Sequence, residues 1–145
     1  QRRNFDQWQK ALRQAEENGI LVISCDPNSI DFGNLTRAQD EAPDSPESYA
    51  PEAWDRRPHP LWVPGGNRTR ASYKGDAVYA FDVVGGRSWS TPYLAGVAAL
   101  GFQVNPVLSP AKAKELLIKS ATLTKNGAVI NPRGFLDLVR NSAKR

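Results

Sequence analysis

The sequence of 145 residues contains no methionine, one cysteine and one histidine. A single cysteine, Cys25, excludes an intrachain disulfide and any metal site built from several thiolates. The longest largely apolar stretch, residues 93–102, is much shorter than the roughly 20 residues that a helix needs to cross a bilayer, so we expect no association with a membrane. Because the chain has no initiator methionine and Gln1 precedes two arginines rather than an apolar signal segment, we expect a processed or excised piece of a longer protein.

The charge balance is also modest, with 19 basic against 15 acidic residues and a net charge of +4. The basic residues are dispersed rather than grouped with aromatic residues, so nucleic acid is not an expected partner. With 40% hydrophobic residues the chain has an ordinary globular composition. At this length it can bury roughly two-thirds of its unfolded surface, which predicts that residues 1–145 belong to one domain.

The N-terminal stretch has the pattern of a helix, with Asp6 available as its cap. Trp8, Leu12 and Ala15 recur at three- and four-residue spacing, and Asn18-Gly19 is a typical helix stop. The apolar run at 20–23 follows at once and is rich in β-branched residues. Such a run predicts a strand that is covered on both faces in a parallel sheet, and therefore an α/β unit.

The segment of about 36–60 has a different character, with five prolines and six acidic residues. Prolines cannot donate backbone hydrogen bonds and carboxylates resist burial, so we expect an exposed loop without a core element. Beyond it, apolar alternation predicts strands at 61–63, before Pro64-Gly65-Gly66, and at 77–84. Helices are expected at 91–103, 109–120 and 135–141, and small residues make the first of them unusually slim.

Ser88 is the main candidate for chemistry. It follows Gly85-Gly86 and a predicted strand and comes just before a predicted helix, a position that suits a nucleophile. The helix N-terminus offers unpaired N–H groups to a developing oxyanion. A serine at a helix start is, however, more commonly an N-cap, and the residues alone leave both interpretations open.

The segment 86–100 resembles the catalytic-serine signature of subtilisin-like serine proteases, Gly-Thr-Ser-x-Ala/Ser-x-Pro followed by a helix of small residues. This resemblance implies a three-layer subtilisin-like α/β fold with a mainly parallel sheet, of which this chain supplies the C-terminal part. It implies a serine endopeptidase that acts on a peptide or protein substrate. Ser88 falls on the nucleophile, and the Ser88 backbone N–H falls on one arm of the oxyanion hole.

Two departures from the family pattern lie beside the nucleophile, where Arg87 replaces threonine and Trp89 replaces methionine. A third concerns the oxyanion amide, which the family takes from an Ala-Gly-Asn turn after the strand. Asn28 would supply this amide if the loop is one residue longer. Strict alignment instead places Pro27 there, and proline cannot donate a hydrogen bond.

The base of the triad is not recognisable in the chain. The single histidine, His59, lies between two prolines and is unlike the family's His-Gly-Thr helix opening, so we expect a solvated loop residue. The family's Asp-Ser/Thr-Gly turn is absent as well. We therefore expect the catalytic Asp and His to lie on an N-terminal part of the same domain, which is the expected partner of this chain.

The alternative is a degenerate, inactive subtilase homologue that acts as a binding or regulatory protein. The resemblance further implies a secreted or extracytoplasmic location, processing of a precursor, and structural calcium as in many subtilases. No other cofactor is expected, and the acidic residues at 40–44 do not have a recognisable calcium spacing.

Overall fold

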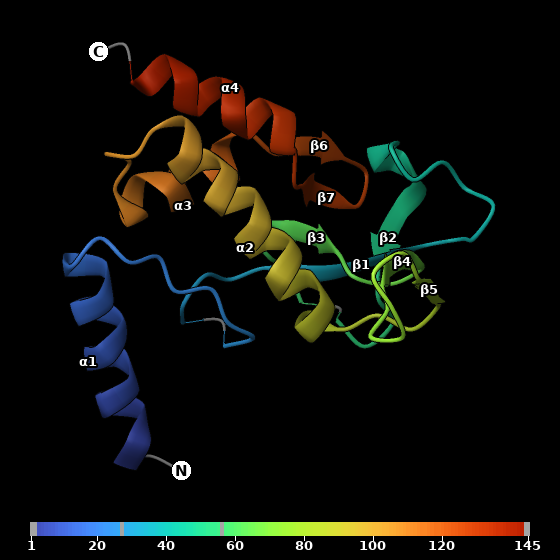
Figure 1. Cartoon of the computed structure of the whole chain (residues 1–145), viewed down its shortest axis with the longest axis horizontal. Coiled ribbons are helices and arrows are strands. Elements are labelled where there is room, and N and C mark those ends of the chain that lie inside the picture. The colour runs from blue at the N-terminus through green and yellow to red at the C-terminus, as the bar shows by residue number, and fades with distance from the viewer. Residues whose placement is uncertain (1–2, 27, 56, 144–145) are drawn as a thin grey trace.

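The computed structural model describes residues 3–26, 28–55 and 57–143. Its centre is a mixed sheet of five short strands in the order β2-β1-β3-β7-β6 (Figure 1). The central strands run parallel, whereas each outer strand is antiparallel to its neighbour. The strands are β1 (Gly33–Arg37), β2 (Tyr49–Pro51), β3 (Trp62–Pro64), β6 (Thr122–Thr124) and β7 (Gly127–Val129). This mixed α/β sheet with its helices is the architecture of subtilisin-like domains, as expected.

Three helices form the apolar core with the sheet, namely α2 (Arg87–Val104), α3 (Pro110–Lys119) and α4 (Pro132–Ser142). Their inward residues meet the apolar side chains of the central strands in one cluster, which includes Phe32, Leu61, Val63, Leu94, Val97, Leu117, Phe135 and Val139. Helix α1 (Arg3–Glu17) stands apart from this core in Figure 1. It is joined to α3 by an ion pair between Glu16 and Lys114 at 3.3 Å.

The ends of the helices follow from local hydrogen bonds. The Ser109 hydroxyl accepts the Lys112 N–H at 3.2 Å and begins α3, and the Asn131 side chain accepts the Gly134 N–H at 2.8 Å and begins α4. Gly19, with a φ of +77°, turns the chain out of α1. The predictions that one helix begins with Ser109 as its cap and that the first helix ends at 18–19 are therefore confirmed. Helix α4 starts at Pro132, three residues before the predicted position.

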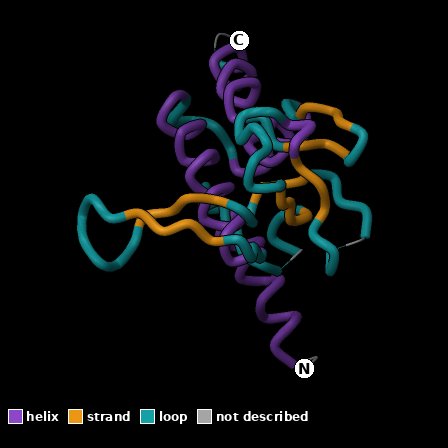
Figure 2. The backbone as a smooth tube through the Cα atoms, turned by 90° about the vertical axis from the view of Figure 1, so that its right-hand side faces the viewer, coloured by secondary structure: helices purple, strands orange, loops and turns teal. Residues whose placement is uncertain are grey.

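A separate hairpin is formed by β4 (Arg68–Ala71) and β5 (Tyr79–Asp82). It projects from the body as a two-stranded arm (Figure 2). Side chains of Arg70 and Asp82 form an ion pair across the two strands. The Arg70 guanidinium also lies 4.7 Å from the centre of the Trp89 ring, which ties the arm to the first turn of α2.

Two expectations about the N-terminal half are wrong. Residues 20–23 do not form a strand: among the described residues, no backbone hydrogen bond joins 21–23 to a neighbour. A strand needs such a partner, however apolar the run is. The segment 36–60 is not only an exposed loop, because it includes the end of β1, the 3-10 turn η1 (Pro46–Ser48) and β2.

The C-terminal half also differs from expectation in α2 and in the hairpin. Helix α2 begins at Arg87 rather than at 91, so Pro92 lies inside the helix rather than in its first turn. Strand β4 was not expected, since Arg-Thr-Arg-Ala has no apolar face, and it forms as the partner of the predicted strand β5.

Two glycines of α2 should respond in opposite ways to alanine. A Cβ at Gly101 would lie 2.5 Å from Cζ of Phe135 on α4, whereas a Cβ at Gly96 would meet nothing within 4 Å. Gly101→Ala should therefore lower the free energy of unfolding by about 1–3 kcal/mol through overpacking. Gly96→Ala should leave it unchanged or raise it by up to about 1 kcal/mol, the difference in helix propensity. Urea unfolding of both variants measures this, and equal effects would contradict the packing of α2 on α4.

Candidate active site

Ser88 lies in the first turn of α2, with its side chain exposed. The N-cap is Gly86, whose carbonyl accepts the N–H groups of Trp89 at 2.9 Å and Ser90 at 3.2 Å. The Ser88 N–H comes before the first hydrogen-bonded N–H of the helix, so it has no acceptor within the helix. Its hydroxyl has no hydrogen-bond partner among the described residues. Ser88 is therefore not a capping residue, and both its groups are available to a ligand.

Glycines allow the backbone on both sides of this turn to come close together. A Cβ on Gly85 would lie 2.3 Å from the Gly66 nitrogen, and one on Gly65 would lie 2.6 Å from the Ser90 hydroxyl. The end of β3 and the segment before α2 are thus in direct backbone contact, which only glycine permits. This contact seats the first turn of α2 over the end of β3.

Ser90 anchors the same turn from inside. Its hydroxyl is fully buried and donates to the Asn34 side-chain oxygen, and the Val63 carbonyl oxygen lies 3.3 Å from it. Asn34 lies in β1, is also fully buried, and its Nδ2 has no partner in the described part of the chain. The polar Asn34 is the reason that β1 was not recognised in the sequence, since a strand of this kind was expected to be apolar.

His59 is buried, and the expectation of a solvated loop residue is wrong. Its side chain is 0% exposed, and a carboxylate faces each ring nitrogen. Asp31 Oδ1 lies 2.9 Å from Nδ1, and Asp55 Oδ1 lies 2.8 Å from Nε2. The Trp62 ring packs against it edge-on, with the ring centres 5.0 Å apart. Two carboxylates satisfy the polar ring, so its burial leaves no nitrogen unpaired.

Asp55 is the more buried of the two carboxylates, with 5% of its side chain exposed against 32% for Asp31. Burial is the largest single influence and raises its pKa. The hydrogen bonds from His59 and from the Asn34 N–H, together with the charges of His59 and Arg87, outweigh burial and hold the pKa below its usual value of 3.8. Asp55 is therefore a carboxylate at neutral pH.

Arg87 joins this group to Ser88. Its Nη2 lies 4.0 Å from Asp31 Oδ1 and 3.9 Å from Asp55 Oδ2. Its Nη1 donates to the Cys25 carbonyl at 3.3 Å. Sequence reasoning noticed Arg87 only as a departure from a pattern. It missed Asp31 and Asp55 altogether, because their separation along the chain carries no signal for this contact.

Asn28 does not lie beside Ser88. Its backbone N–H and its side-chain amide both donate to Asp26 Oδ1, at 2.8 and 2.6 Å. It lines a hollow of about 110 Å³ between α1 and α3, together with Gln9 and Lys114. The structure thus does not bring Asn28 and Ser88 into contact, and the role of Asn28 in an oxyanion hole stays a prediction. Pro27, the other residue at this position, lies outside the described residues.

The arrangement supplies part of the machinery of a hydrolase. The exposed hydroxyl and free N–H of Ser88 are groups of the kind that serve as a nucleophile and an oxyanion donor. His59 does not act as the base for Ser88, since both of its nitrogens face carboxylates and its ring is buried. Among the described residues, no group of three His, Cys, Asp or Glu side chains is suited to hold a metal ion.

A serine in the first turn of a helix, over the end of a strand in a mixed α/β sheet, is an arrangement that serine hydrolases use. In the comparison with protein families, residues 1–135 match the Subtilase family, and the chain belongs to this family. Family membership supports a serine protease kind of function.

Known proteins agree with this assignment. Alkaline serine exoprotease A of Vibrio alginolyticus is 34% identical over 77 residues, which are 53% of this chain and 13% of that protein. The self-cleaved protease domain of PatA has a TM-score of 0.63 at 19% identity, covering 92% of this chain and 55% of that one. For a protease of Pseudoalteromonas arctica the TM-score is 0.58 at 18% identity, with 90% and 46% covered. At these identities the two structures show the fold alone.

The chain spans 13% of the length of the curated relative and about half the length of these solved structures. In the described part of the chain, no helix has the length and hydropathy needed to cross a membrane.

Asp55→Asn should destabilise the chain near neutral pH and much less in acid. A carboxyl with a lowered pKa in the folded state stabilises the fold fully above its unfolded value of about 3.8, and this contribution is lost as the pH falls below that value. We expect the free energy of unfolding to fall by about 3 kcal/mol at pH 7, because the variant breaks a buried charged network. The difference should be much smaller at pH 3.

Urea unfolding at pH 7, 5 and 3 measures this dependence. Asp137→Asn is the matched control, since Asp137 pairs with Arg140 on the surface of α4 with 58% of its side chain exposed. It should change the free energy of unfolding by no more than about 0.5 kcal/mol at each pH. A loss in Asp55→Asn that is the same at pH 3 and pH 7 would contradict the ionised, paired state of Asp55.

Proposed function

We propose that the chain is the C-terminal part of a subtilisin-like serine endopeptidase and that Ser88 is its nucleophile. The observation that supports this most is the state of Ser88, whose exposed hydroxyl and backbone N–H are both without a partner in the described structure. A serine held at a helix start for structural reasons would use its hydroxyl as a cap, as Ser109 does in α3.

In the proposed reaction, the Ser88 hydroxyl attacks the carbonyl carbon of a peptide bond while a base takes its proton. The Ser88 N–H donates a hydrogen bond to the oxyanion that forms, aided by the positive end of the α2 dipole. The amine leaves with the proton, and water then hydrolyses the acyl-enzyme. Asn28 remains the proposed second donor, and it would first have to release Asp26.

The base and its orienting carboxylate are proposed to come from an N-terminal part of the same domain. A serine hydroxyl needs a hydrogen-bonded histidine to attack an amide at neutral pH. His59 is engaged on both nitrogens, and the described chain holds no other histidine. The partial coverage of the related structures supports the same conclusion.

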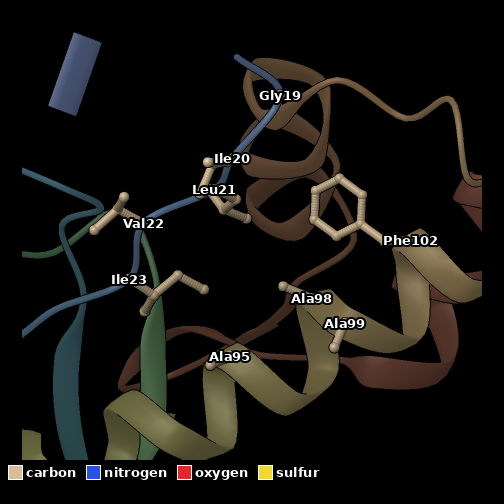
Figure 3. A pocket seen from close by; sticks show the side chains of 9 residues that line it. All are labelled: Gly19, Ile20, Leu21, Val22, Ile23, Ala95, Ala98, Ala99 and Phe102. Carbon is tan, nitrogen blue, oxygen red and sulfur yellow. The ribbon is translucent and has the colours of Figure 1, made fainter. Parts of the chain in front are cut away.

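One groove on this chain has the volume and the unpaired backbone groups that the N-terminal part would need for binding. It has a volume of about 600 Å³ and lies between residues 19–23 and the small side chains of α2 (Figure 3). Backbone groups of 21–23 face no partner in the described residues, so an added strand would satisfy them. Ala95 and Ala99 project little from α2, which allows another backbone to approach closely.

The second candidate is an inactive homologue that binds rather than cleaves peptides. Trp89, directly after Ser88 and 39% exposed, favours it, because the Arg70 guanidinium holds a bulky ring beside the nucleophile. For either candidate we propose a secreted or extracytoplasmic protein released from a precursor, as the resemblance to subtilases implies.

A serine-directed fluorophosphonate probe should label Ser88 in the whole protein that contains this chain. Ser88→Ala should abolish this labelling because it removes the acceptor oxygen, whereas Ser120→Ala at the end of α3 should not reduce it. Intact-mass measurement gives the labelled fraction, and peptide mapping locates it. A folded whole protein in which Ser88 stays unlabelled would favour the inactive homologue.

Ala99→Glu should weaken the association between this chain and its N-terminal part. The carboxylate would be buried unpaired in the groove, and we expect the dissociation constant to rise at least about tenfold, or about 1.4 kcal/mol. Ala111→Glu is the matched control, since Ala111 is an exposed alanine on α3 that does not line the groove. Calorimetric titration of the separately produced parts measures the difference, and equal effects of the two variants would place the interface elsewhere.

A further inference from the structure

A cluster of charged side chains lies directly beneath the first turn of α2. It contains Asp31, Asp55, His59 and Arg87, and Arg87 immediately precedes Ser88. We propose that Asp55 and His59 are positioning residues for Ser88 and that they act through Arg87. This inference rests on the proposed function of Ser88 as the nucleophile.

His59 sets the distance between the two carboxylates. Its nitrogens lie 2.9 Å from Asp31 and 2.8 Å from Asp55, and its side chain is 0% exposed. The two ring nitrogens face the two carboxylates from different sides of the ring. The imidazole therefore acts as a spacer that holds two negative charges on one side of the Arg87 guanidinium.

The Arg87 side chain is held from several directions. Both carboxylates lie within 4.0 Å of its Nη2, the Cys25 carbonyl accepts from its Nη1, and the Phe32 ring centre lies 5.4 Å from its guanidinium carbon. Only 15% of the side chain is exposed. These contacts restrict the side chain to one orientation, and its backbone position is restricted with it.

A second connection leads from Asp55 to the same turn. Asp55 Oδ2 accepts the backbone N–H of Asn34 at 2.9 Å, and the Asn34 side chain accepts from the Ser90 hydroxyl. Asp55 is thus linked to the residue before Ser88 and to the residue two after it. Ser88 makes no side-chain bond of its own in the described structure, so these neighbours determine its orientation.

Stability alone does not account for such a cluster. Replacing a buried ion pair by apolar side chains of similar volume is often neutral or stabilising, because charges lose their hydration on burial. Placement of a nucleophile does account for it, since a displacement of about 1 Å at a reacting group can cost about 10²-fold in rate. The cluster adjoins Ser88, the proposed nucleophile, whose placement would affect the rate of the proposed reaction.

A double-mutant cycle tests whether Asp55 acts through Arg87. The rate constant for fluorophosphonate labelling of Ser88 would be measured in the whole protein for Asp55→Asn, Arg87→Met and the double variant. Each single substitution should lower the rate at least about tenfold. The double variant should be no slower than the slower single variant, because both remove the same connection. If the losses in labelling rate of the two single variants multiply in the double variant, the proposal is overturned. Single variants that are labelled at the wild-type rate would overturn it as well.

Controls separate positioning from loss of the fold. Asp137→Asn, at a surface ion pair, should label at the wild-type rate. In a ¹⁵N-labelled sample of the whole protein, the ring N–H signals of His59 are assigned by their absence from the His59→Gln variant, and burial should protect them from solvent exchange. Asp55→Asn should shift these signals and Asp137→Asn should not. If circular dichroism shows that Asp55→Asn does not fold, His59→Gln takes its place in the cycle.

The outcomes distinguish this inference from the proposed function. A folded wild-type protein that is never labelled overturns both, since no nucleophile then needs a position. Labelling of the wild type with multiplying losses overturns only the role of Asp55 and His59.

Discussion

The buried hydrogen bond from Ser90 to Asn34 fixes where α2 meets the sheet, and the rest of the site depends on it. It requires a polar residue inside β1 and glycine at position 65, where any Cβ would overlap both partners. It also brings the start of α2 over the end of β3, close to Asp55. Ser88 is presented to solvent because the residues around it, rather than Ser88 itself, make the contacts that hold the turn.

The same turn shows how this subtilase differs from the family pattern. An arginine takes the place of the threonine before the nucleophile, and a positive charge in that partly buried place needs compensation. The carboxylates of Asp31 and Asp55 supply it from two loops. The substitution and these carboxylates are therefore one feature of the chain.

Local patterns in the sequence were enough to predict α3 and the presence, though not the start, of α4. Caps, proline at the first turn and glycine pairs act within a few residues, so their signal is contained in the sequence. The burial of His59 depends on a carboxylate 28 residues away, which no local pattern reveals. The strand expected at 20–23 failed for a related reason, since an apolar run predicts burial but not the presence of a partner to pair with.

Both outer strands of the sheet are short and antiparallel, β2 and β6 having three residues each. Short edge strands discourage sheets from joining one another. The run Leu21-Val22-Ile23 has no backbone partner in the described structure and no such protection, and it combines strong β-propensity with an absence of charge. Aggregation of this chain during expression would therefore begin at these residues.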